Sequence, residues 1–117
     1  MLSRIHSVLI WTDDPNRLVP FYRDVLGLKV EMEGEFAVFS LDGAGLAIGK
    51  HSDVRGRSRD PNRVMIDFQV SDCQAEYDRL RQRGVEFLRP PSKEGDGLII
   101  ATLLDADGNV LQLFQEG

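Results

Sequence analysis

The sequence has little cysteine, no long apolar run and no excess of basic charge, and each of these features excludes a class of protein. The single cysteine, Cys73, excludes an intrachain disulfide, so a reducing cytoplasm is the expected compartment. No apolar run approaches the roughly 20 residues of a membrane-spanning helix, and residues 1–4 do not resemble a signal peptide, so no membrane partner is expected. The formal net charge of −5 argues against nucleic acid as the main partner.

What the sequence does contain, near its start, is a segment that predicts a strand followed by a helix. Residues 4–11 are apolar and β-branched, as in a strand buried on both faces. Asp14 is placed to cap a helix, and Pro15 suits the first helical position. Gly27 can take the left-handed conformation that ends a helix. One helical face is predicted to carry the apolar side chains spaced i, i+3, i+4 and i+7, namely Leu18, Phe21, Tyr22 and Val25.

The same order of residue types returns about half the chain later and predicts a duplicated unit. Residues 63–70 form a second apolar run, and Ser71 and Gln74 have the spacing of a capping box. A second amphipathic helix follows, and Gly84 is placed to end it. A repeat of this length indicates that the fold is built from two similar modules.

Three further strands are predicted after each helix. They cover residues 28–33, 35–41 and 46–49 in the first half, and 85–88, 98–104 and 109–115 in the second, with a loop at 90–97. The chain is therefore predicted to be one α+β domain over residues 1–117. Two β-α-β-β-β modules, at 4–49 and 63–115, would be joined by a polar connector at 50–62.

Two segments carry a resemblance to a known family. They read FYRDVLGL at residues 21–28 and DADGNVLQL at residues 105–113. With the two modules, they resemble the vicinal oxygen chelate superfamily, in which similar segments read FYxxxLG and DPDGNxxEL. That group includes glyoxalases, fosfomycin-resistance transferases, bleomycin-binding proteins and extradiol dioxygenases. The resemblance implies a mixed sheet curved into a half-barrel with helices on its outer face, a small organic molecule as partner, and a homodimer.

The resemblance also implies where metal-using members would hold a divalent ion. By position, His6 matches the first histidine ligand, Met65 stands in place of the second, and Gln112 replaces the carboxylate of the last strand. The additional glutamate of glyoxalases falls at Ala47 or, with a shift of register, at Gly49. Because His6, Met65 and Gln112 include no anionic ligand, we expect the metal centre to be lost and no metal cofactor to be bound.

Asp67 leaves an alternative open. Side chains alternate along a strand, so Met65 and Asp67 share one face. An irregular divalent metal site at His6, Asp67 and Gln112, or a metal-free acid–base pair of His6 and Asp67, would then be available. The plainer interpretation is a hydrogen-bonded pocket histidine and a carboxylate satisfied by a neighbour.

Other side chains are candidates for the pocket or for packing. Ala47 and Gly49 leave room that suits an organic ligand. Phe36, Phe39 and Phe114 are candidate wall residues, although alternation alone does not say which of them face inward. Met65, Trp11 and Cys73 are expected to be packing residues, and the arginines at 55, 57 and 59 to be a solvated connector more often than a clamp for an anion.

The sequence therefore predicts a small-molecule-binding protein of the glyoxalase and bleomycin-resistance type with a degenerate metal site. The alternative is a lyase, isomerase or dioxygenase-like enzyme that uses the irregular metal site or the His6–Asp67 pair. A purely structural interaction protein would instead have a filled cavity. The predicted ligand-binding residues are His6, Ala47, Gly49, Met65, Asp67 and Gln112.

Overall fold

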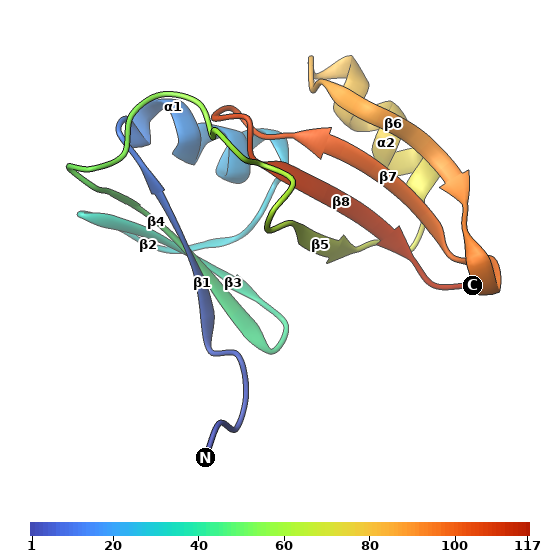
Figure 1. Ribbon diagram of the computed structural model, residues 1–117, viewed down its shortest axis with the longest axis horizontal. Helices are drawn as coiled ribbons and strands as arrows, with labels where there is room; N and C mark the ends of the chain where they lie inside the picture. Colours follow the sequence, from blue (N-terminus) through green and yellow to red (C-terminus); the bar gives the residue numbers. More distant parts are fainter. The chain divides into compact units, whose positions relative to one another are not determined.

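A computed structural model describes residues 1–117, and the chain forms two compact units, residues 1–56 and 57–117. The first unit contains β1 (Ser7–Thr12), α1 (Pro15–Pro20), η1 (Phe21–Val25), β2 (Val30–Glu33), β3 (Phe36–Leu41) and β4 (Ala44–Lys50). The second contains β5 (Ile66–Gln69), α2 (Cys73–Gln82), β6 (Phe87–Lys93), η2 (Gly95–Gly97), β7 (Ile99–Leu104) and β8 (Val110–Gln115). The predicted order β-α-β-β-β therefore occurs twice (Figure 1).

The two sheets have the same topology. Their strand orders are β1-β4-β3-β2 and β5-β8-β7-β6. In each unit the first strand pairs in parallel with the last, and the remaining pairs are antiparallel. Each sheet is thus mixed and open, which confirms an α+β fold of two repeated modules. No helix of the chain is long and apolar enough to cross a membrane.

The first helix begins as predicted and, after an irregular turn, ends before the predicted glycine, since Leu26 is its C-cap and Gly27 has a φ of 80°. The Asp14 carboxylate accepts a hydrogen bond from the Asn16 N–H at 3.0 Å, so Asp14 is the N-cap. Pro20 has no N–H to donate to the preceding turn, and the chain continues as one wider π-helical turn, in which Leu26 N–H donates to the Phe21 carbonyl at 2.8 Å. Leu18 and Tyr22 are fully buried, whereas the Phe21 and Val25 side chains are only half-buried. The four predicted positions therefore do not form one uniformly buried face.

The second helix is capped by a different residue from the one predicted. The Asp72 carboxylate accepts from the Ala75 N–H at 3.0 Å, and α2 begins at Cys73. The side chain of Gln74 donates to Asp78 along the helix instead of reaching back. The predicted capping box of Ser71 and Gln74 is therefore wrong, because the ionised Asp72 is the stronger acceptor.

The segment predicted as a loop after residue 88 begins as a strand. β6 runs through Pro90 and Pro91, with register shifts against β7 between Arg89 and Ser92. β6 is an edge strand, where a proline removes no hydrogen bond from the interior of the sheet. The position of the strand in the sheet, which the sequence does not reveal, makes these prolines tolerable.

Each sheet has one face covered by its helix and one open face. In the first unit the covered face carries Ala37, Phe39, Leu46 and Ile48, all buried, and the Tyr22 ring lies 6.4 Å from that of Phe39. In the second unit the buried side chains of β7 and β8 alternate in the same way and face α2, namely Ala101, Leu103, Leu111 and Leu113. The alternate positions of both sheets form the open faces, which carry the candidate site residues Ala47, Gly49, Asp67 and Gln112.

Candidate functional site

The open face of the first sheet is largely apolar. Register places Leu9 beside Ala47, and Ala47 beside Val38 on its other side. Leu9 is 54% exposed and Met32, paired with Val38, is 60% exposed. Because large apolar side chains are left uncovered here, this face differs from an ordinary solvated sheet surface.

An aromatic cluster covers one end of this face. The rings of Trp11 and Phe36 meet edge to face, with centroids 5.5 Å apart. They close over Gly49, where an added Cβ would lie 2.5 Å from Phe36 Cε1 and 3.0 Å from Trp11 Cζ3. Gly49 is therefore required for this packing, and the two rings, not the glycine, form the surface at this predicted ligand position.

A pocket of about 400 Å³ opens near the other end of the sheet, where β3 turns into β4. Two of the predicted site residues, His6 and Ala47, line it together. His6 lies one residue before β1, and its backbone carbonyl accepts from the Gly45 N–H at 3.0 Å. The alternation of β1 puts Ser7, and not His6, in phase with Trp11 on the open face.

The open face of the second sheet carries a polar row across three neighbouring strands. Gln112 of β8 is the register partner of Asp67 on β5 and of Thr102 on β7. The Gln112 amide donates to the Thr102 hydroxyl at 3.3 Å. Asp67 is exposed, whereas Thr102 is buried. The structure thus brings together two predicted residues, Asp67 and Gln112, and adds Thr102.

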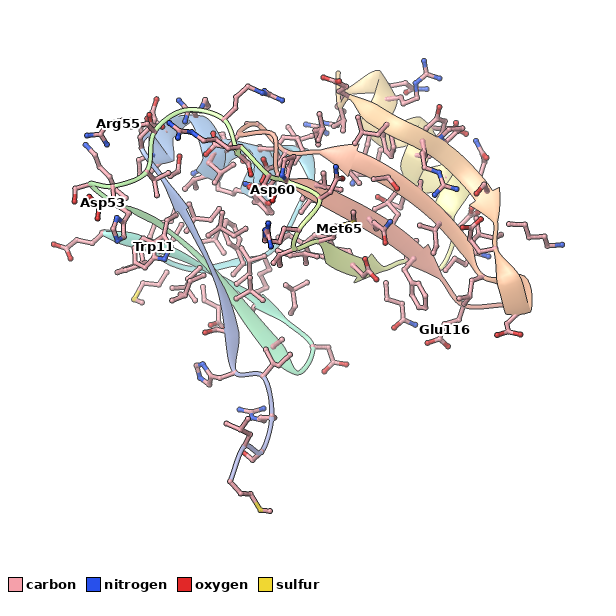
Figure 2. All side chains as sticks on the ribbon, in the orientation of Figure 1. Trp11, Asp53, Arg55, Asp60, Met65 and Glu116 are labelled. Carbon is pink, nitrogen blue, oxygen red and sulfur yellow. The ribbon has the colours of Figure 1, made fainter.

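The remaining candidates are placed as follows. Met65 directly precedes β5 (Figure 2). It is 40% exposed, and alternation puts it in phase with Asp67. Phe114 lies on the open face of its sheet, as Phe36 does on the other, whereas Phe39 is fully buried on the covered face. Phe39 therefore packs against the helix, and it is also among the residues that line the pocket at the turn between β3 and β4.

Sequence reasoning missed Trp11 and Thr102 as open-face residues. Alternation from Ser7 could have put Trp11 on the same face as Leu9, but it does not show which face the helix covers. Thr102 could be found only from the pairing of β7 with β8. A polar residue in an otherwise apolar strand was the one signal available for it.

The segment at residues 105–109 is a tightly bonded turn. Asp105 Oδ1 accepts from the N–H groups of Asp107 and Asn109 at 2.8 and 2.9 Å, and Oδ2 accepts from Asn109 Nδ2 at 2.9 Å. Gly108 has a φ of 79° and lies under the Arg57 guanidinium, which an added Cβ would approach to 2.8 Å. These residues shape the start of β8 and so set the register of Gln112.

Two further sequence features have structural roles. Arg55 donates to the carbonyls of Ser52 and Val54, within the connector itself. Cys73 is fully buried, and its N–H donates to Gln115 Oε1 at 2.7 Å. Burial, together with the nearby Asp72 carboxylate, raises the pKa of the Cys73 thiol. A buried, protonated thiol of this kind is inert, as expected for a packing cysteine.

The donor atoms do not fit a divalent metal ion of the kind this architecture holds. Within each unit, no three His, Cys, Asp or Glu side chains come together in an arrangement that could hold a metal ion. The second sheet offers one carboxylate, an amide, a hydroxyl and the thioether of Met65. Hard, oxygen-preferring cations need more anionic oxygen than this, and softer ones need imidazole or thiolate.

Comparison with known proteins gives matches along nearly the whole chain. The family model described as Glyoxalase/Bleomycin resistance protein/Dioxygenase superfamily matches residues 4–113. The metallothiol transferase FosB of Staphylococcus epidermidis is 27% identical over 116 residues, covering 97% of this chain and 84% of that protein. The uncharacterized protein YurT of Bacillus subtilis is 43% identical over 49 residues, which span 42% of this chain and only 38% of YurT.

Solved structures agree on the fold. A glyoxalase/bleomycin resistance protein/dioxygenase from Nocardioides has a TM-score of 0.75 at 24% identity, covering 99% of this chain and 86% of that one. A protein of unknown function from Agrobacterium tumefaciens has a TM-score of 0.81 at 22% identity, covering 100% and 97%. At these identities the likeness concerns the backbone arrangement and not the chemistry of a site.

Proposed function

This chain belongs to the glyoxalase/bleomycin resistance protein/dioxygenase superfamily, and from that premise we propose that it binds a small organic molecule without a resident metal ion. Under this proposal the open face of each unit contributes ligand-binding residues, and the protein is a homodimer in the cytoplasm. The contributing residues are His6, Ala47 and Gly49 of the first unit and Met65, Asp67 and Gln112 of the second.

The observation that carries the proposal is the polar row of the second sheet. Ionised Asp67 can only accept hydrogen bonds, whereas Gln112 and Thr102 can both donate and accept. A ligand with an amine, amide or hydroxyl donor would satisfy Asp67 directly, and a bare carboxylate would be repelled. The row is therefore better matched to a hydrogen-bonding organic molecule than to a metal-chelated anion.

An enzymatic function is the second candidate, because the likeness to a protein named metallothiol transferase extends over 97% of the chain. The reaction would be that of a lyase, an isomerase or a dioxygenase-like enzyme. It would use either an irregular divalent metal site at His6, Asp67 and Gln112 or a metal-free acid–base pair of His6 and Asp67. The donor set described above favours binding over this alternative.

A ligand screen by thermal shift tests the proposal. Wild type, Asp67→Asn and Met65→Leu are each screened against polar, partly aromatic compounds and against simple dicarboxylates, with EDTA present. We expect hits among the compounds that carry a hydrogen-bond donor. Asp67→Asn should reduce the binding free energy of these hits by about 1–3 kcal/mol, because a charge-assisted hydrogen bond is lost. Met65→Leu should bind nearly as wild type does, because it keeps the volume and removes no hydrogen bond.

Two outcomes of this screen would count against the proposal. If no compound binds in EDTA but compounds bind once nickel or zinc is added, the enzymatic alternative with a metal gains the support. If Asp67→Asn binds every hit as tightly as wild type does, the Asp67 carboxylate does not recognise the ligand and has only a structural role.

A further inference from the structure

The apolar end of the first open face presents a fixed aromatic surface. Trp11 and Phe36 hold each other edge to face, and Phe36 remains 37% exposed. Gly49 beneath them leaves no side chain to push the rings apart. An exposed aromatic pair held by packing offers a planar ligand stacking or edge contacts at low entropic cost.

His51 supports the outer side of this cluster. Its ring meets Trp11 edge to face with centroids 5.2 Å apart, and its Nδ1 accepts from the Asp53 N–H at 3.0 Å. In the neutral ring, this hydrogen bond leaves the proton on Nε2. Figure 2 shows Trp11 and Asp53 at the same end of the first unit. The connector thus fixes the imidazole, and the imidazole in turn restricts the indole.

The other end of this face is the pocket of about 400 Å³, a volume typical of small-molecule sites. Arg4, His6, Ser7 and Ser40 bring hydrogen-bond donors to its lining, and Glu31 is the one carboxylate. Donors therefore outnumber anionic acceptors, which favours an oxygen-bearing group on the ligand. Val38 and Ala47 make the adjoining wall apolar.

The two ends are close enough for one molecule to reach both. Ala47 lines the pocket, and Gly49, two residues further along β4, lies under the rings. Two residues of extended chain span about 7 Å. A bicyclic aromatic ring with one polar substituent covers this span, whereas a short dicarboxylate has no surface to place against the rings.

Resting on the proposed function, we propose that the open face of the first unit selects an aromatic molecule that carries a hydroxyl or carboxylate. The aromatic ring lies against Trp11 and Phe36, and the oxygen lies in the pocket beside Arg4 and His6. This assigns a recognition role to Trp11, Phe36 and Arg4, which lie outside the positions at which metal-using relatives place their ligands, and gives His6 a role that needs no metal ion.

The test uses 2-naphthoate and its saturated counterpart decahydro-2-naphthoate as probes of equal charge and similar size. Trp11 is the only tryptophan of the chain, so its indole N–H gives one resonance in a ¹H–¹⁵N spectrum. We expect 2-naphthoate to shift this resonance saturably and to bind about two- to tenfold more tightly than the saturated acid, as an aromatic contact of ordinary strength implies. If the two acids bind equally, or if 2-naphthoate leaves the indole resonance unmoved, the aromatic assignment is overturned.

Variants separate this site from binding elsewhere. Phe36→Leu should lower the affinity for 2-naphthoate by a similar two- to tenfold. Ser40→Leu changes an exposed position of the pocket lining, so it should abolish the shift of the indole resonance without disturbing the core. Leu88→Ala, an exposed apolar position of the second unit, is the matched control and should bind as wild type does. Equal binding by wild type and both first-unit variants would refute the proposal.

The remaining outcomes distinguish failure of this inference from failure of the proposed function. If other compounds bind in a manner sensitive to Asp67→Asn but 2-naphthoate does not bind, this inference fails and the proposed function stands. If no small molecule binds at all, both fail. An indole resonance that shifts with protein concentration in the absence of any probe would mean that a second copy of the chain covers this face, which also overturns the inference.

Discussion

At the scale of single residues, Asp105 shows how one side chain can fix a segment. Three of its hydrogen bonds hold the turn into β8, and the residue is 4% exposed. Removing the carboxylate leaves two backbone N–H groups and an amide without this acceptor in a buried turn. Because the turn precedes Gln112 directly, its loss should affect the open face as well as stability.

We therefore expect Asp105→Ala to lower the free energy of unfolding by on the order of 3 kcal/mol, measured by urea denaturation. Asp105→Asn should cost less, because its carbonyl oxygen can still accept from the two backbone groups. The control is Asp42→Ala, at an exposed turn position of the first unit. A cost for Asp105→Ala no larger than that of the control would show that the turn is held by other contacts.

At the scale of elements, the start of α2 depends on which side chain reaches the free N–H groups. The Asp72 carboxylate accepts from Ala75 N–H, and the exposed Ser71 makes no such contact with the helix. The carboxylate also lies at the positive end of the helix dipole, which adds to its value as a cap.

Asp72→Ala should accordingly destabilise the protein by about 1 kcal/mol, and Ser71→Ala by no more than a few tenths. Chemical denaturation of the two single variants measures the difference directly. A larger cost for Ser71→Ala than for Asp72→Ala would restore the capping box that the sequence pattern suggested.

The raised pKa of Cys73 should also fall towards its ordinary value in Asp72→Ala, since one of its two causes is removed.

At the scale of the whole molecule, the metal question depends on residues from both units. We predict from the family resemblance that Met65 and Gln112 occupy the positions of a histidine and a carboxylate in metal-using relatives, and His6 belongs to the other unit. If His6 belongs to the same centre, restoring both donors should give a metal affinity that depends on His6. If it does not, any gain comes from the second unit alone, where the two new donors would lie on the same face as Asp67.

We expect purified wild type to carry clearly less than one transition metal ion per chain by elemental analysis. The double variant Met65→His, Gln112→Glu should bind nickel or zinc more tightly than wild type, measured by calorimetry, because it adds an imidazole and a carboxylate. The further variant His6→Ala in that background should reverse the gain. About one tightly held ion per wild-type chain would contradict the metal-free proposal. No gain of metal affinity in the double variant would contradict the positions assigned to Met65 and Gln112.

The repeated order of elements could be predicted from the amino-acid sequence, because local signals specify it. These signals are the alternation along each strand, the Asp14 cap and the glycines at 27 and 84, which act over a few residues and need no partner strand. Gly27 has a φ of 80° and Gly84 a φ of 86°. The sequence also predicted that Asp67 and Met65 share a face. The assignment of His6, Met65 and Gln112 to the metal positions of the family stays a prediction from the resemblance.

The covered face of each sheet and the neighbours of each strand could be assigned from the folded chain alone. The helix buries Phe39 and leaves Phe36 open, although both are phenylalanines of one strand. Pairing of β7 with β8 brought Thr102 beside Gln112, and the edge position of β6 allowed its two prolines. These outcomes depend on contacts between segments far apart in the chain, where burial and strand pairing outweigh the local preferences that a sequence pattern records.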